Sequence, residues 1–248
     1  MGYKGLYVMI MLSFVILYVP KVHGQIELDT ETGLVFSGYN DVRIPGDGGT
    51  LFSLSQELEA DPGIFYRIRV FYHFNERHHL GALYAPLSIE SKGQLDKDLV
   101  FEETTFPGNT PLKAAYTFNS YRLVYRYDVL RNNNIDIGIG FTAKIRDAKI
   151  AVNGAGLKSE KTNVGFVPII HFRILWKFAK SVSLLIDGDA LAAPQGRAED
   201  VLTGVIYQPS QTVKLKAGYR ILEGGADNDE VYNFALINYA VIGTIFAF

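Results

Sequence analysis

The stretch VGFVPIIHFRILWKF, residues 164–178, decides the fold, because its side chains alternate in character along the whole stretch. One face is apolar throughout: Val164, Phe166, Pro168, Ile170, Phe172, Ile174, Trp176 and Phe178. The other face carries His171, Arg173 and Lys177 among small and apolar side chains. A period of two residues is typical of a β-strand. The stretch is also much longer than the roughly 5–6 residues of an ordinary globular strand.

The same alternation recurs in residues 64–74, 135–145 and 213–221. Strands of about ten residues with an apolar and a polar face suit a wall between lipid and a wet lumen. A soluble β-sandwich also alternates, but its strands are shorter and its polar face meets solvent. The pattern therefore predicts an all-β chain that forms a transmembrane, antiparallel, up-and-down β-barrel.

The composition excludes several classes of function. The 24 Lys and Arg against 26 Asp and Glu give a net charge of −2, so no global basic character points to nucleic acid as a partner. The chain has no cysteine, which excludes disulfides, thiolate metal sites and a lipidated N-terminal cysteine. No complete metal or cofactor motif is present, and we predict neither.

The N-terminal segment has the parts of a secretory signal peptide. Lys4 precedes an apolar run from Leu6 to Val19, and the small residue Gly24 follows. We predict a signal peptide at 1–24 and a single barrel domain at 25–248. An uncleaved membrane anchor is the alternative, although the run is short for a span of roughly 20 residues.

The mature part divides into about ten strands, with eight as the alternative count. The predicted strands cover residues 33–44, 63–74, 78–90, 112–130, 134–150, 161–178, 181–193, 199–208, 211–223 and 231–248. The stretch from Thr50 to Leu58 is a candidate extra hairpin arm. An even number of strands places both termini on the same side of the membrane, which in outer-membrane barrels is the periplasmic side.

The connections between these strands alternate in length. Short turns are predicted at Asn75 to Arg77, Arg131 to Asn134, Ala179 to Ser181 and Pro209 to Gln211. Longer links rich in Gly, Asp or Pro are predicted at Pro45 to Asp61, Ser91 to Pro111, Val152 to Lys161, Pro194 to Asp200 and Glu223 to Glu230. Outer-membrane barrels have short periplasmic turns and long outer loops, so this alternation predicts periplasmic termini.

The last strand ends in an aromatic residue. Tyr232, Phe234 and Leu236 begin an apolar face that continues to the terminal Phe248. This ending resembles the C-terminal signal by which bacterial outer-membrane barrels are recognised for insertion. We therefore expect the barrel-assembly machinery and the lipids of the outer membrane as partners.

Three stretches resemble segments of one protein family: residues 38–46, 188–200 and 218–234. They look like segments of a family of small, largely uncharacterised outer-membrane β-barrel proteins of Gram-negative proteobacteria. The resemblance implies the fold and the location. It carries no catalytic or ligand-binding pattern over to this chain.

The face opposite the apolar one is predicted to line a basic lumen. Its cationic and histidine side chains are Arg67, Arg69, Arg122, Arg126, Lys144, Arg146, His171, Arg173, Lys177, Lys214, Lys216 and Arg220. The clear inward acids are fewer: Asp128, Asp136, Asp187 and Asp189. Strand pairing is expected to bring His171 and Arg173 beside Asp187 and Asp189, and Arg220 opposite Asp200.

Three interpretations of this lumen follow. In the first, its charges form salt-bridged ladders that fill a narrow barrel. In the second, surplus positive charge attracts a small anionic solute to a pore or pocket. The anion-binding candidates are Arg67, Arg69, Arg122, Arg126, Arg173, Lys214, Lys216 and Arg220. In the third, Asp187, Asp189 and His171 activate water in a hydrolase acting on lipid A or peptides. We favour a non-enzymatic barrel, structural or narrowly permeable.

Overall fold

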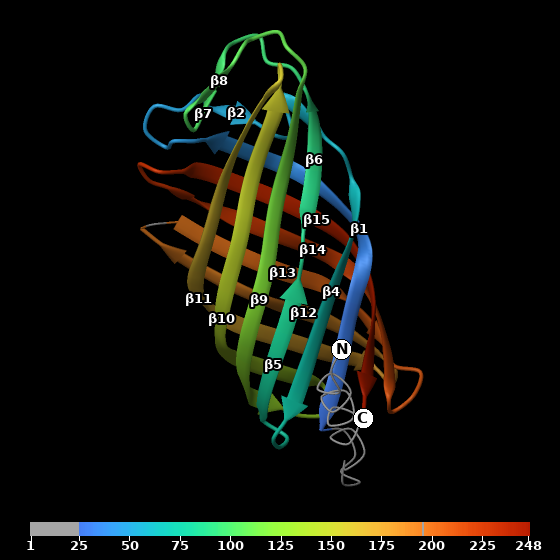
Figure 1. Cartoon of the computed structure of the whole chain (residues 1–248). Helices are drawn as coiled ribbons and strands as arrows, with labels where there is room; N and C mark the ends of the chain where they lie inside the picture. The colour runs from blue at the N-terminus through green and yellow to red at the C-terminus, as the bar shows by residue number, and fades with distance from the viewer. Residues whose placement is uncertain (1–24, 195) are drawn as a thin grey trace, which may run out of the picture.

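The computed structural model describes residues 25–194 and 196–248 as an antiparallel β-barrel (Figure 1). Within these ranges ten strands form a closed wall, in which each pairs with the next and β15 returns to β1. The wall strands are β1 (Ile26–Arg43), β4 (Gly63–His73), β5 (His78–Ala85), β9 (Leu112–Arg131), β10 (Ile135–Gly154), β11 (Leu157–Ala179), β12 (Val182–Ala193), β13 (Gly196–Tyr207), β14 (Val213–Asp227) and β15 (Tyr232–Ala247). The ten-strand prediction is confirmed.

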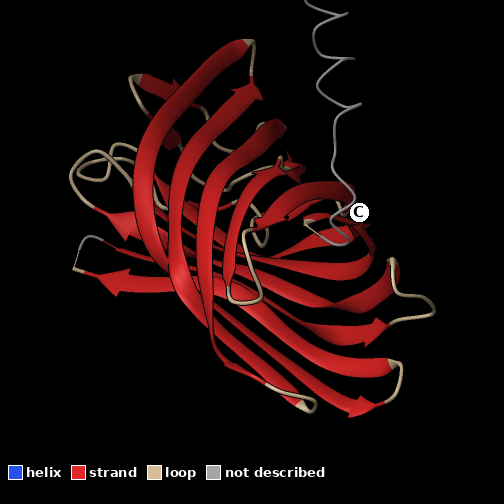
Figure 2. Ribbon diagram, turned by 90° about the horizontal axis from the view of Figure 1, so that it is seen from below, coloured by secondary structure: helices blue, strands red, loops and turns tan. Residues whose placement is uncertain are grey.

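The predicted signal peptide at 1–24 lies outside the described residues. Within the described ranges, no helix is long and apolar enough to cross a bilayer. Seen from below, the chain consists of strands joined by loops (Figure 2).

The third predicted strand, residues 78–90, is divided into β5 and β6 (Ser88–Gly93), and both pair with β9. Pro86 lies at the break, where it cannot donate a hydrogen bond to a neighbouring strand. The ladder continues across the break, because the Phe118 N–H donates to the Leu87 carbonyl over 2.9 Å.

Three of the five predicted long links are wrong, because the strands continue through them. Residues 152–154 belong to β10, and 157–161 belong to β11. Ala155 and Gly156 between them have φ values of 51° and 76°, as a two-residue type I′ hairpin requires. The links predicted at Pro194 to Asp200 and Glu223 to Glu230 likewise consist largely of β13 and β14.

The other two long links, Pro45 to Asp61 and Ser91 to Pro111, fold over one end of the barrel. They contain β2 (Phe52–Ser53), β3 (Leu58–Ala60), β7 (Leu99–Phe101) and β8 (Thr104–Phe106). The candidate hairpin arm from Thr50 to Leu58 is wrong, since β2 pairs with β1 whereas β3 pairs with β6. Six of their apolar side chains are almost fully buried: Phe52, Leu54, Leu58, Leu99, Phe101 and Phe106. We call residues 44–62 and 94–111 the cap.

Both termini of the described chain lie at the end opposite the cap (Figure 1). They are tied together there, because the Phe248 N–H donates to the Ile26 carbonyl over 2.9 Å. The tight turns between β4 and β5 and between β9 and β10 lie at the same end.

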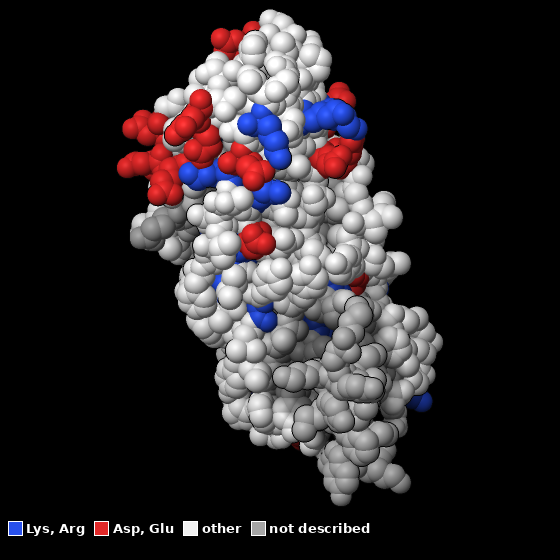
Figure 3. All heavy atoms as spheres, viewed as in Figure 1, with Lys and Arg blue, Asp and Glu red and all other residues white. Residues whose placement is uncertain are grey.

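The outer face of the barrel carries an apolar belt. Ile64, Val164 and Phe166 are 82%, 70% and 66% exposed, a degree that water would penalise but lipid would not. Charged side chains gather toward the cap end, and the face below them is mostly uncharged (Figure 3). The predicted direction of the alternation, apolar outward and polar inward, is therefore confirmed.

The first wall strand begins earlier than predicted, at Ile26 instead of residue 33. Residues 26–32, IELDTET, alternate with acids on the inward face, so they complete the lumen between β15 and β4. Because these residues are largely acidic and polar, the sequence pattern placed the start of the first wall strand after them.

The seam between β11 and β12 is incomplete. Their register runs from Ala179 opposite Val182 to Ile170 opposite Ala190, although β11 pairs with β10 from Leu157 to Trp176. Among the described residues, the segment Leu157 to Ile169 has no strand partner on its β12 side. In Figure 1, β9, β10 and β11 stand upright while β12 to β15 lean away. We call this interruption the lateral gap.

Candidate functional site

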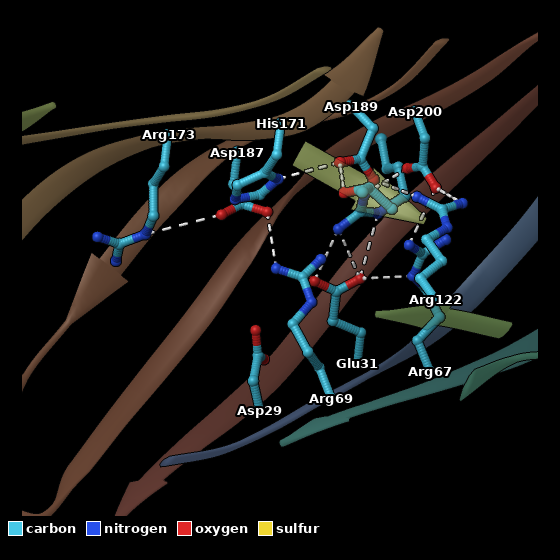
Figure 4. A network of polar contacts seen from close by, with 12 residues as sticks. Asp29, Glu31, Arg67, Arg69, Arg122, His171, Arg173, Asp187, Asp189 and Asp200 are labelled. Carbon is cyan, nitrogen blue, oxygen red and sulfur yellow. Dashed lines mark hydrogen bonds and ion pairs between the residues drawn. The ribbon is translucent and has the colours of Figure 1, made fainter. Parts of the chain in front are cut away.

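A layer of buried charges crosses the middle of the barrel (Figure 4). We call it the charge cluster and define it by eleven side chains: Asp29, Glu31, Arg67, Arg69, Arg122, His171, Asp187, Asp189, Asp200, Lys216 and Arg220. They come from β1, β4, β9, β11, β12, β13 and β14. Each is placed inward by strand alternation, so the wall itself builds the layer.

Asp200 is the point where three arginines meet. Its carboxylate accepts from Arg67 Nη2 at 3.0 Å, Arg122 Nη2 at 2.5 Å and Arg220 Nη1 at 2.5 Å. The Asp200 side chain is 2% exposed. The predicted register, with Arg220 opposite Asp200, is wrong by two residues, because in the ladder Asp200 lies opposite Leu222. The two side chains are nevertheless in contact.

Glu31 is the second centre. Its carboxylate accepts from Arg220 Nη2 at 2.8 Å and from Lys216 Nζ at 2.7 Å, and Arg67 Nε lies 3.5 Å away. Lys216 also donates to Asp29 over 2.6 Å. These acids of β1, which the sequence analysis missed, supply the partners for the cations of β14.

The proposed catalytic trio belongs to the same layer. His171 and Arg173 lie opposite Asp189 and Asp187, as the strand pairing predicts. His171 Nδ1 is 3.0 Å from Asp189 Oδ1, while Arg69 Nη1 donates to Asp187 over 2.8 Å. Asp189 also accepts from Arg122 at 2.5 Å and from the Thr142 hydroxyl at 2.6 Å. The carboxylates are thus occupied by structural partners.

The predicted surplus of positive charge is almost cancelled. Among the described residues, seven Lys and Arg side chains are buried against six Asp and Glu. The acids of β1 account for the difference from the prediction. Salt-bridged filling of the barrel, the first interpretation of the lumen, therefore describes its midsection.

The remaining anion-binding candidates lie toward the end with the termini. Arg126 Nε is 3.0 Å from Asp128, and Lys214 Nζ is 3.0 Å from Glu27. Arg173 and Lys214 line a cavity of about 410 Å³ at this end, together with Lys177. We call it the lower cavity.

A second cavity of about 450 Å³ lies between the charge cluster and the cap, and we call it the upper cavity. Its volume is in the range of ordinary small-molecule sites, roughly 300–1,000 Å³. Most of its lining is apolar and includes Phe118, Ala148, Leu191, Leu222 and Ile237.

Five cations line the upper cavity, and two of them, Lys161 and Arg197, pair with Glu102 and Glu223. Lys144, Arg146 and Lys149 have no carboxylate partner among the described residues, and of these Lys144 and Arg146 lie on the inward face of β10. Lys144 is 3% exposed and makes no hydrogen bond or ion pair within that part of the chain. Its Nζ lies 4.8 Å from the centroid of the Phe118 ring. Arg146 donates to Asn163, and its buried Nε has no partner there. The sequence placed both residues inward but gave no reason to prefer them.

Comparisons with solved structures identify the fold. The outer membrane protease OmpT from Escherichia coli superposes with a TM-score of 0.54 at 11% identity, covering 92% of this chain and 99% of that one. The transport unit of the Escherichia coli autotransporter AIDA-I gives 0.50 at 10% identity, covering 99% and 98%. No protein-family model matches the sequence, and no curated protein matches it. Identities this low carry the fold alone: this chain has the fold of a Gram-negative outer-membrane β-barrel.

Proposed function

We propose that the protein is a non-enzymatic outer-membrane barrel that binds a small anion in its upper cavity. One observation carries this proposal: Lys144 and Arg146 line an apolar cavity without a carboxylate partner among the described residues. A buried cation without an anion is costly, and an anionic ligand would remove that cost. The eight anion-binding candidates predicted from the sequence differ from Lys144 and Arg146, because most of the eight already form ion pairs with acids.

The charge cluster supports binding over conduction. It lies between the upper and the lower cavity, and its arginines and acids are nine-tenths or more buried. An anion that enters the upper cavity therefore meets a layer of matched charges. A narrow pore would require water to pass through this layer, where the carboxylates are saturated by arginine and lysine.

We further propose that the termini are periplasmic and that the cap faces outward. The tight turns at the end with the termini and the two long links at the other end support this orientation. The exposed apolar belt between the two ends supports insertion in the outer membrane.

The geometry gives no comparable support to hydrolysis by Asp187, Asp189 and His171. Both carboxylates accept hydrogen bonds from arginines. None of the three residues lines the upper or the lower cavity. A general base needs room for a substrate beside it, and these side chains are packed against their partners.

Isothermal titration calorimetry with hexyl phosphate tests anion binding. For protein refolded in a neutral detergent we expect saturable binding, weakened about tenfold or more by Lys144→Gln, because a charge-assisted hydrogen bond contributes roughly 1.5–3 kcal/mol. Lys180→Gln, at the exposed turn between β11 and β12, is the matched control and should bind as the wild type does. Equal affinities for the wild type and Lys144→Gln would contradict the proposed site.

Assembly through the last strand gives a separate prediction. Phe248 is 64% exposed at the β1–β15 seam, so we expect its deletion to leave refolding in detergent unchanged. In cells the same deletion should strongly reduce the heat-modifiable band of folded protein on a gel, because the assembly machinery would recognise the terminal aromatic residue. The control is Phe74→Ala, which removes an exposed aromatic side chain outside the last strand and should assemble normally. Normal assembly without Phe248 would contradict the role of this residue.

A further inference from the structure

We propose that the ligand of the upper cavity is a single-chain anionic amphiphile whose hydrocarbon tail enters from the membrane through the lateral gap. The proposal rests on the proposed function for the anionic head. It adds the substrate class and the route. Three features carry it: the interrupted seam, the course of the upper cavity and the position of the two cations.

The seam is interrupted because the neighbouring hairpin is short. β11 has 23 residues, whereas β12 and β13 have 12 each. Pairing with β11 stops at Ala190 opposite Ile170, and β12 itself ends at Ala193, so it cannot accompany the rest of β11. Pro168 lies in the segment without a β12 partner. Proline suits a strand edge, since it has no N–H to donate.

The upper cavity reaches this gap from inside. Its lining includes Phe166, Val167 and Pro168 on the β11 side, and Leu191 and Ala193 on the β12 side. Leu191 follows Asp189 on the inward face of β12, yet it is 38% exposed. Backbone with open hydrogen-bonding positions is tolerated at membrane depth where it is buried in protein or lines a water-filled cavity. Residues 166–168 of the unpaired edge of β11 line the upper cavity, which gives water access to that edge.

The part of the gap farther from the cap, residues 164–169, lies within the apolar belt. Val164 and Phe166, on the outward face of the segment without a β12 partner, are 70% and 66% exposed. The opening between β11 and β12 is therefore flanked by side chains suited to hydrocarbon. An apolar tail would pass from the bilayer into an apolar cavity without crossing water, so this route avoids the cost of exposing its CH₂ groups to water.

The two cations fix where the head lies. Arg146 rests against Gly165 of β11, where a Cβ would come within 3.0 Å of its Nη2. Its guanidinium is thus beside the open part of β11, while Lys144 lies closer to the charge cluster. About 450 Å³ corresponds to about fifteen water-sized groups at roughly 30 Å³ each, enough for one chain with a small head. A lipid with several acyl chains would not fit.

Tryptophan fluorescence quenched by brominated lipid tests the route. The only tryptophan is Trp176, on the outward face of β11. We would place Leu191→Trp in a Trp176→Phe background and reconstitute it in nanodiscs of brominated phosphatidylcholine. We expect quenching as strong as that of Trp176 in the wild type, because the lateral gap exposes this inward position to acyl chains.

Leu185→Trp is the matched control, since it lies on the same inward face of β12 but opposite Leu175, where the seam is closed. It should be protected from brominated lipid. Leu191→Trp protected to the same degree would overturn the lateral route. Heat-modifiable gel mobility verifies folding, and Ala193→Trp replaces Leu191→Trp if the latter does not fold.

A second titration tests the amphiphile. Bromododecanoate added to Leu191→Trp in unbrominated nanodiscs should quench in a saturable manner, and Lys144→Gln should abolish saturation. If hexyl phosphate binds but brominated lipid does not quench Leu191→Trp, the proposed function stands and this inference is overturned. If Leu191→Trp is quenched by lipid but neither anion binds, the anionic head is wrong and both proposals fail.

Discussion

Replacing Asp200 by alanine is expected to lower the free energy of unfolding by about 3–5 kcal/mol, the usual cost of removing one partner of a buried ion pair. Asp200 contacts Arg67, Arg122 and Arg220 within 3.0 Å, so its loss leaves like charges facing one another at the centre of the barrel. Urea titration of the refolded protein, followed by Trp176 fluorescence, measures the change.

The control is an exposed pair of similar geometry. Lys92 Nζ lies 2.7 Å from Asp61, and both side chains are more than half exposed. Asp61→Ala should therefore leave the free energy of unfolding close to that of the wild type. Equal, small changes in the free energy of unfolding for both variants would mean that the charge cluster is hydrated. The proposal that it forms a barrier between the two cavities would then be wrong.

The second large effect is expected from removing four charges together. The variant Glu31→Ala, Arg67→Ala, Asp200→Ala, Arg220→Ala deletes two acids and two bases from the charge cluster. We expect it to join the upper and lower cavities into a water-filled path. In planar bilayers it should show discrete conductance steps, whereas the wild-type barrel should show none.

This variant should fold although Asp200→Ala alone is strongly destabilised. Removing both members of a buried pair leaves no uncompensated charge. Of the remaining cations, Arg122 stays paired with Asp189 at 2.5 Å, and Lys216 stays paired with Asp29 at 2.6 Å. Heat-modifiable gel mobility verifies that the barrel has formed before conductance is measured.

The control is a double substitution away from the midsection that removes one acid and one base and leaves the net charge unchanged. Lys161 and Glu102 form a 2.8 Å pair that joins β11 to the cap, so Glu102→Ala with Lys161→Ala should stay non-conducting. Conductance steps in the wild type, or silence in the folded fourfold variant, would show that the charge cluster is not the barrier.

Much of the wall could be predicted because each strand separates two unlike environments. Lipid outside and packed polar groups inside impose a period of two, and β11 displays it over residues 164–178. The juxtaposition of His171 with Asp189 follows from that period and a tight turn. These properties depend on residues close together in the chain, so they can be predicted from a single sequence.

The first strand shows the limit of this reasoning. Residues 26–32 alternate, but their inward side chains are acids, two of their outward side chains are threonines, and no apolar run marks a strand boundary. Their assignment to the wall depends on Lys216 and Arg220 from the far end of the chain. The charge balance of the lumen could not be predicted without them.

The lateral gap and the preference for Lys144 and Arg146 also lie beyond the sequence pattern. The gap arises from the difference in length between β11 and the neighbouring β12–β13 hairpin. Gly- and Asp-rich stretches such as residues 223–230 favour loops as much as strand ends, so the sequence does not give the length of each hairpin. Whether an inward cation has a partner depends on the register of several strands at once. Lys144 looks the same as Lys216 in the sequence, yet only Lys216 meets acids in the described structure.

The joining of β1 to β15 has a consequence for the order of folding. Asp29 and Glu31 leave the synthesis machinery early, but Lys216 and Arg220 follow 185 to 189 residues later. Contacts this distant along the chain form late, after the loop-closure entropy between them has been overcome. We therefore expect the circumference of the barrel to close late in folding, when the last hairpin pairs with β1 and brings Lys216 and Arg220 to these acids.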